Sequence, residues 1–210
     1  IGWGISIYKR VIQKSVRNVL IFIAELIIFW FVVRTTKYFF TMDNQIARYL
    51  WYSYYIPMLF IPVAVLQAAF FLGKSEEYRL PKWLKGVYIP TAVLVLLVLS
   101  NDLHQLVFSF PVGSAWSDSH YTYGWGYYVV LIWEVVCALT AFVLMIYKCR
   151  HSQKKKYLPL FGIGAAVLYA VLFISGVAWV QEIGGDITAV LCLFFVGILE
   201  SCVRCGLIQT

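Results

Sequence analysis

Long apolar stretches recur along this chain, separated by short polar segments. Six of them are long enough to cross a bilayer, which takes about 20 predominantly apolar residues in a helix. They cover residues 18–40, 49–73, 83–110, 125–147, 157–179 and 187–207. A seventh apolar segment, residues 1–8, is too short to cross, and we interpret it as the end of a truncated helix. The pattern predicts an all-α integral membrane protein: a seven-helix transmembrane bundle with six complete spans, forming a single domain over residues 1–210.

Helix-breaking residues agree with these boundaries. Pro111 follows the third complete span, and Gly184 and Gly185 separate the last two. Pro57 and Pro62 lie inside an apolar run, where a membrane helix tolerates a kink because neighbouring groups satisfy the freed carbonyls. The apolar runs are therefore expected to be helical throughout.

Composition narrows the class of protein. Hydrophobic residues make up 62% of the chain and charged residues only 13%, whereas a soluble domain carries about 25% charged residues. A soluble protein could not cover its surface with so few charges. The net charge of +7 is explained by basic loops beside a membrane, so no nucleic-acid partner is expected. The five cysteines imply no disulfide framework, since most lie in apolar segments.

Basic residues predict the orientation. Of the 17 Lys and Arg residues, all but Arg34, Lys37 and Arg48 belong to loops or helix ends on one side of the predicted bundle. Lys and Arg accumulate on the cytoplasmic side of membrane proteins. We therefore expect the N-terminus outside the cell and the C-terminus in the cytoplasm.

Several ionisable residues fall within or beside the apolar spans, near the predicted outer face. Such residues are costly in a membrane, face the bundle interior and often mark a functional site. The candidates for ligand binding or signal sensing are Arg34, Arg48, Asp102, His104, Glu134 and Asp186. They predict either an outward-opening polar pocket for a small-molecule or membrane-derived ligand or for protons, or a structural network that holds the helices together. The sequence leaves both interpretations open.

A second candidate site lies at the inner end of the last span. Glu200 precedes Arg204 by four residues, the spacing and order that place an ion pair on one face of a helix. The pair is either structural or part of a signal relay to whatever follows. Cys202 and Cys205 have the spacing of a redox or metal motif, but without a second pair they are expected to be buried thiols.

The sequence lacks the motifs of several enzyme classes and of retinal proteins. The last span contains no Lys between residues 187 and 207, so a retinal Schiff base of the rhodopsin type has no attachment point there. No zinc-protease motif, nucleophile elbow or glycine-rich phosphate loop is present. We expect a non-catalytic fragment with no cofactor and no bound metal.

Three strings resemble a known family. They are residues 48–58, residues 99–108 followed by 123–127, and residues 199–208. Together they are similar to the seven-helix N-terminal sensor region of bacterial sensor histidine kinases, and the most specific part is Asn101-Asp102-Leu103-His104 followed by an aromatic outer loop. The resemblance implies a multi-pass protein of the bacterial cytoplasmic membrane that passes a signal to a dimeric kinase module after residue 210, and so to a response regulator.

The sequence is also compatible with two other functions. One is a fragment of a transporter or proton-coupled permease that uses Asp102, Glu134 and Arg34. Transporters are usually built from internal repeats, and none is recognisable here. The other is a structural membrane module that only dimerises a soluble enzyme. The sensor domain is the function that the sequence favours.

Overall fold

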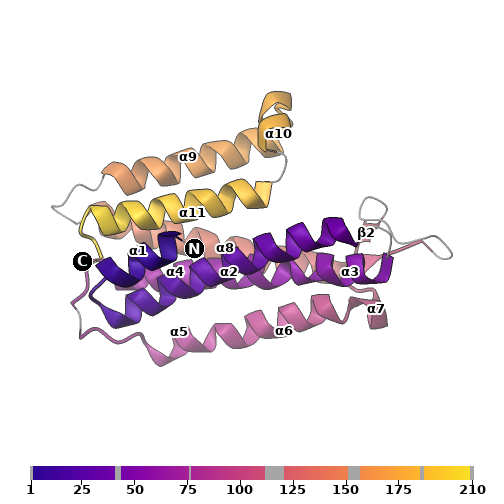
Figure 1. Cartoon of the computed structure of the whole chain (residues 1–210), viewed down its shortest axis with the longest axis horizontal. Helices are drawn as coiled ribbons and strands as arrows, with labels where there is room; N and C mark the ends of the chain where they lie inside the picture. The colour runs from indigo at the N-terminus through magenta and orange to yellow at the C-terminus, as the bar shows by residue number, and fades with distance from the viewer. Residues whose placement is uncertain are drawn as a thin grey trace.

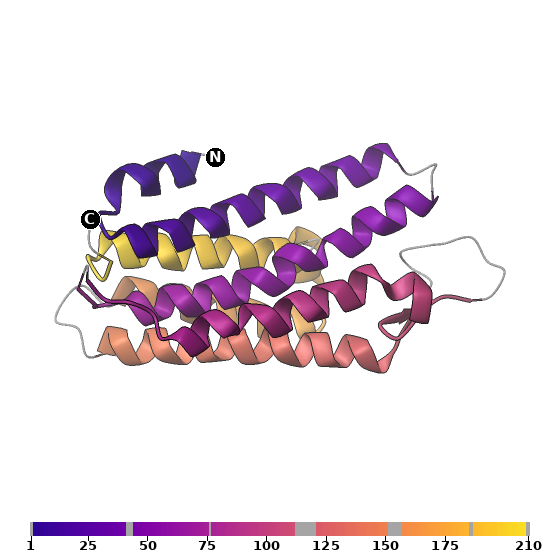
Figure 2. The same ribbon diagram turned by 90° about the horizontal axis from the view of Figure 1, so that it is seen from below.

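The computed structural model describes residues 2–40, 44–75, 77–111, 121–150, 157–184 and 187–208. These residues form an elongated bundle whose long helices run side by side (Figures 1 and 2). The elements are α1 (Gly2–Arg10), α2 (Lys14–Phe39), α3 (Asn44–Ser53), α4 (Tyr55–Phe71), α5 (Lys82–Gly86), α6 (Tyr88–Leu99), α7 (Asn101–His104), β1 (Phe108–Ser109), β2 (Thr122–Tyr123), α8 (Trp125–Arg150), α9 (Tyr157–Ile174), α10 (Ala178–Gly184) and α11 (Ile187–Arg204).

Helix α4 is the centre of the bundle. Its residues are apolar on nearly every side, as in a helix buried all round. It packs against α2, α6 and α8, while α9 and α11 form a second pair that packs together. The side chains of Leu59, Val63 and Ala64 on α4 are completely buried. The core therefore runs the length of α4.

The long apolar helices confirm an all-α membrane domain. In the described part of the chain, four helical segments are long and apolar enough to cross a bilayer: Lys14–Lys37, Gln45–Phe71, Lys82–Leu99 and Trp125–Cys149. A further apolar helix, Tyr157–Phe173, is shorter. The number of seven crossing helices stays a prediction.

The span predicted at residues 49–73 is kinked. It consists of α3 and α4, which meet at Tyr54. Pro57 explains the interruption, because proline has no N–H to donate and its ring crowds the carbonyl of Ser53, one turn earlier. Pro62 lies inside α4 without ending it. The expected tolerance of α4 for proline is confirmed.

The span predicted at residues 83–110 ends early, and the expectation of helix up to Phe110 is wrong. The helical part stops at His104, and Gln105 takes a left-handed backbone conformation with φ of 50°. The chain then reverses into β1, which pairs antiparallel with β2. The side chain of Asn101 accepts hydrogen bonds from the backbone of this reversal.

The helix predicted over residues 157–179 is also interrupted. Helix α9 ends at Ile174, and α10 begins at Ala178. Between them Gly176 has φ of 75°, and the N–H of Val177 donates to the carbonyl of Leu172 at 3.2 Å. This is the usual termination of a helix by a left-handed glycine. A glycine at the same kind of position, Gly206, terminates α11 with φ of 67°.

One end of the bundle gathers the segments that the sequence predicted to be basic and cytoplasmic. The Gln13 side chain, between α1 and α2, donates to the carbonyl of Ser75 at 2.9 Å, and the N–H of Gly73 donates to Leu207 at 2.9 Å. We call this the basic end. Helix α7 and strand β2 lie at the opposite end, the outer end (Figure 1). The orientation of the two ends across a membrane stays a prediction.

Candidate functional site

Asn101 organises the outer end of the bundle. Its side chain is completely buried. The Oδ1 atom accepts hydrogen bonds from the N–H groups of Val107 and Phe108, each at 3.0 Å, and Nδ2 donates to the carbonyl of Phe108 at 2.8 Å. One amide thus satisfies backbone groups that lose their helical partners after His104. Because buried backbone groups must be paired, Asn101 permits the chain reversal that follows α7.

The returning chain packs very closely against this reversal. The N–H groups of Gly124 and Gly126 donate to the carbonyls of Val107 and Leu106, both at 2.9 Å. A Cβ atom on Gly124 would lie only 2.1 Å from the Leu106 carbonyl oxygen. Glycine is therefore required at position 124 for β2 and α8 to start where they do.

Asp102 is held by two groups from α3. A guanidinium nitrogen of Arg48 lies 2.9 Å from Asp102 Oδ2, and the hydroxyl of Tyr52 donates to Oδ1 at 2.8 Å. Asn101 Nδ2 in turn donates to the Tyr52 hydroxyl at 3.2 Å. These four residues, Arg48, Tyr52, Asn101 and Asp102, form what we call the outer polar network. It ties α3 to α7.

His104 does not join this network. Its Nδ1 accepts the N–H of Leu106 at 3.0 Å, and its Nε2 lies 3.2 Å from Ser100 Oγ. Because Nδ1 is an acceptor, a neutral ring carries its proton on Nε2, which can donate to Ser100. No hydrogen bond links His104 to Asp102 among the residues that the structure describes. His104 therefore stabilises the turn, although the sequence placed it among the sensing candidates.

A cluster of aromatic rings surrounds Phe108 and lies next to the outer polar network. The ring of Phe108 is completely buried, with Trp51 at a centroid distance of 4.6 Å, Tyr55 at 5.5 Å and Tyr121 at 5.4 Å. The Tyr52 ring is stacked with that of Phe108 at a centroid distance of 6.2 Å. Tyr55 also lines a cavity deeper in the bundle. The rings thus connect the network to that cavity.

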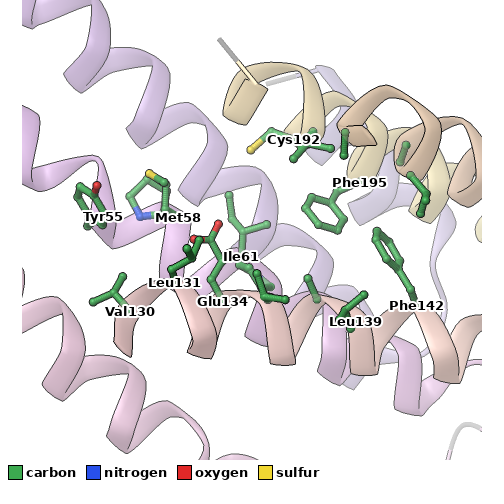
Figure 3. A pocket seen from close by; sticks show the side chains of 18 of the residues that line it. Tyr55, Met58, Ile61, Val130, Leu131, Glu134, Leu139, Phe142, Cys192 and Phe195 are labelled. Carbon is green, nitrogen blue, oxygen red and sulfur yellow. The ribbon is translucent and has the colours of Figure 1, made fainter. Parts of the chain in front are cut away.

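The cavity has a volume of about 540 Å³ and is bounded by α4, α8, α9 and α11, with Trp30 of α2 also in its lining. Figure 3 shows Glu134 extending from α8 into this space, toward the side of Met58 and Ile61. The lining is otherwise apolar or aromatic, and Glu134 is the one charged residue in it within the described part of the chain. We call this space the Glu134 cavity.

Two sensing candidates remain, Arg34 and Asp186. The guanidinium carbon of Arg34 lies 5.6 Å from the ring centroid of Trp30, and Trp30 lines the Glu134 cavity. Asp186 lies outside the described residues. Among those residues no hydrogen bond or ion pair joins Glu134 to Asp102 or Arg48, so the structure separates the expected single pocket into a network and a cavity.

The inner acid has more partners than its sequence neighbours suggested. Glu200 Oε1 accepts from Arg204 Nε at 2.8 Å, which confirms the predicted pair on one face of α11. Arg10 Nη2 donates to both carboxylate oxygens at 2.8 Å, and Trp3 Nε1 donates to Oε2 at 3.1 Å. Glu200 therefore joins α11 to α1. Sequence reasoning missed Arg10 and Trp3, because no local pattern relates them to a residue near the other end of the chain.

Cys202 and Cys205, which have the spacing of a metal motif, differ in exposure. Cys202 is buried and Cys205 partly so, as expected for thiols in this helix. Among the residues that the structure describes, no group of three His, Cys, Asp or Glu side chains could hold a metal ion.

Comparison with known proteins then identifies the family. The family described as the N-terminal 7TM region of histidine kinase matches residues 1–203. The chain belongs to this family. The histidine kinase 7TM region so matched includes the outer polar network, the Glu134 cavity and Glu200, and the resemblance seen in the sequence is confirmed. No curated protein and no solved structure matches the chain.

Membership determines the broad role. A histidine kinase 7TM region is a multi-pass membrane segment associated with signal transduction, and it is distinct from the catalytic part of the kinase. The apolar helices of the structure agree with the membrane location.

Proposed function

We propose that this 7TM region is the signal-input domain of a sensor histidine kinase and that it relays a cue through α11 to a cytoplasmic kinase module. The observation that carries the proposal is the family match over nearly the whole chain. The match also favours a sensor over the transporter fragment considered from the sequence.

The contacts of α11 support a relay through this helix. Cys192 and Phe195 of α11 line the Glu134 cavity, and Glu200 on the same helix binds Arg10 and Trp3 of α1. A single helix therefore touches both the cavity and the α1 contact at the basic end. A ligand shifts the balance between two states of the bundle when it binds one state more tightly than the other. Because α11 contacts both the cavity and α1, a ligand in the cavity can change the contact at the basic end through this helix.

The wider assignment follows from the same proposal. The basic end faces the cytoplasm of a bacterial cell, the N-terminus lies outside, and the kinase module that continues from α11 dimerises and phosphorylates a response regulator. The distribution of Lys and Arg supports the orientation.

Glu200 provides the test. In the full-length protein in nanodiscs, Glu200→Gln weakens three contacts at once and is expected to change basal autophosphorylation several-fold, in line with allosteric couplings of about 1–3 kcal/mol. The matched control is Glu182→Gln, which neutralises an exposed acid on α10 and should leave the activity unchanged. Wild-type basal activity in Glu200→Gln would show that α11 does not carry the signal through this residue.

A further inference from the structure

The Glu134 cavity opens toward the side of the bundle. Leu131 and Leu139 of α8 and Val167 and Val171 of α9 line it, and all four are substantially exposed. Because these lining residues are exposed, we infer that the cavity is accessible from the side formed by α8 and α9. Both helices are apolar along this exposed face, where a membrane protein meets lipid. A molecule dissolved in the bilayer can therefore reach the cavity without passing through water.

Two polar groups in this apolar lining have no hydrogen-bond or ion-pair partner among the residues that the structure describes. Within the described residues the carboxyl group of Glu134 makes no hydrogen bond or ion pair, and it extends into the cavity (Figure 3). The indole N–H of Trp30, a residue only 2% exposed, also finds no hydrogen-bond partner in the described part of the chain. An unpaired polar group in an apolar environment is costly, and ionisable residues kept at membrane depth usually have a functional reason.

The size and chemistry of the cavity define what would fit. A volume of about 540 Å³ lies within the range of sites for small organic ligands, which are mostly apolar with a few placed polar groups. The long apolar walls suit an alkyl or ring body, and the single carboxylate suits one positive charge. An anionic ligand would bring a second negative charge next to Glu134, and a neutral one would leave the carboxylate without a counter-ion.

We propose that the Glu134 cavity binds a membrane-partitioned amphiphile that has an apolar body and one ammonium group, and that this group pairs with Glu134. Phe195 of α11 lies in the same lining, so a bound amphiphile can act on the relay helix. Only this effect on signalling rests on the proposed sensor function. Occupancy itself depends on the cavity alone. A buried ammonium–carboxylate pair also has charge-assisted hydrogen bonds, which are stronger than neutral ones.

The test compares two photoreactive probes in the full-length protein in phosphatidylcholine nanodiscs. One is decylamine and the other decan-1-ol, each carrying a diazirine on its chain, and the labelled peptides are mapped by mass spectrometry. We expect the amine to label residues of α8 and α9 around the cavity at least about five-fold more than the alcohol, as one favourable charge pair would give. Glu134→Gln should reduce amine labelling to the level of the alcohol, whereas Glu182→Gln should not change it.

A second variant covers the case in which Glu134→Gln does not accumulate. Leu139→Trp fills part of the cavity and should suppress labelling of the site by both probes. Equal labelling by amine and alcohol in the wild-type protein, amine labelling that survives either cavity variant, or labelling confined to other surfaces would each overturn the proposal. The Glu200→Gln kinase assay is independent of these probes, so the ligand proposal and the sensor function can fail separately.

Discussion

Arg48 and Asp102 pair at 2.9 Å across the outer end of the bundle. Arg48 belongs to α3, which begins the span formed by α3 and α4, and Asp102 belongs to α7, which ends the next span. Both side chains are mostly shielded, with 26% and 20% of their surface exposed. The pair is therefore intermediate between the weak ion pairs of exposed surfaces and the strongly coupled ones of protein interiors.

A double-mutant cycle measures this pair. Arg48→Gln and Asp102→Asn should each lower the free energy of unfolding in mixed micelles, with a coupling energy on the order of 1 kcal/mol. The double variant should then be less destabilised than the sum of the two single ones. If the effects simply add, the ion pair contributes nothing to stability.

The same substitutions distinguish sensing from structure at this site. Asp102→Asn in the full-length kinase should shift the dose or pH response if the outer polar network senses a signal, while the protein still accumulates. Failure to accumulate would assign the network a structural role. An unchanged response in a stable variant would remove Asp102 from the sensing site.

Asn101 should be the most sensitive residue of the outer end. Asn101→Ala leaves the N–H groups of Val107 and Phe108 without their acceptor, and we expect a loss of about 2–4 kcal/mol in the free energy of unfolding. Ser53→Ala is the control, because its hydroxyl only bonds back to Tyr49 within its own helix. A similar, small effect of both substitutions would contradict the role given to Asn101.

Two glycines should respond in opposite ways to alanine. Gly124→Ala places a methyl group against the Leu106 carbonyl and should cost about 1–3 kcal/mol through overpacking. Gly164→Ala on α9 meets nothing within 4 Å and should be neutral or stabilising by up to about 1 kcal/mol, because alanine favours helix. Thermal unfolding of the two variants in one detergent tests the contrast.

The proposed orientation can be tested with single cysteines. In a Cys205→Ser background, Thr122→Cys should react with an impermeant thiol reagent added to intact cells, and Ser75→Cys should react only after the cells are opened. Both positions are exposed, and they lie at the outer and basic ends respectively. The reverse pattern would invert the bundle and exclude a cytoplasmic kinase after α11.

Local patterns predicted the helices well because apolar length decides which segments can be buried in lipid. The early end of the span at His104 was not predictable in this way. The residues after it are as apolar as those before, and the cause is one amide, Asn101, that binds backbone groups six and seven residues further on. Hydropathy records no such hydrogen bonds. The available signal in the sequence was the group of polar residues from Asn101 to Gln105 inside an apolar run.

In the candidate site, too, contacts between residues close in the sequence were predictable and contacts between distant helices were not. Glu200 and Arg204 were predicted as a pair because four residues make one turn of helix. The pairing of Arg48 with Asp102 and of Glu200 with Arg10 depends on how helices pack, which a single sequence does not specify. Glu134 and Asp102 were grouped because both lie near the predicted outer face of the membrane. In the structure their side chains point to different places, Glu134 into the cavity and Asp102 toward Arg48 and Tyr52.

The termination of α11 has a mechanical consequence. The helix does not continue as a straight rod beyond the bundle, since Gly206 turns the chain and Leu207 accepts a hydrogen bond from Gly73, just after α4. Ile208 is then almost completely buried. Any displacement of residues 207 and 208 that preserves this bond must also move the end of α4. The exit from the bundle is thus anchored to two helices, and both of them line the Glu134 cavity.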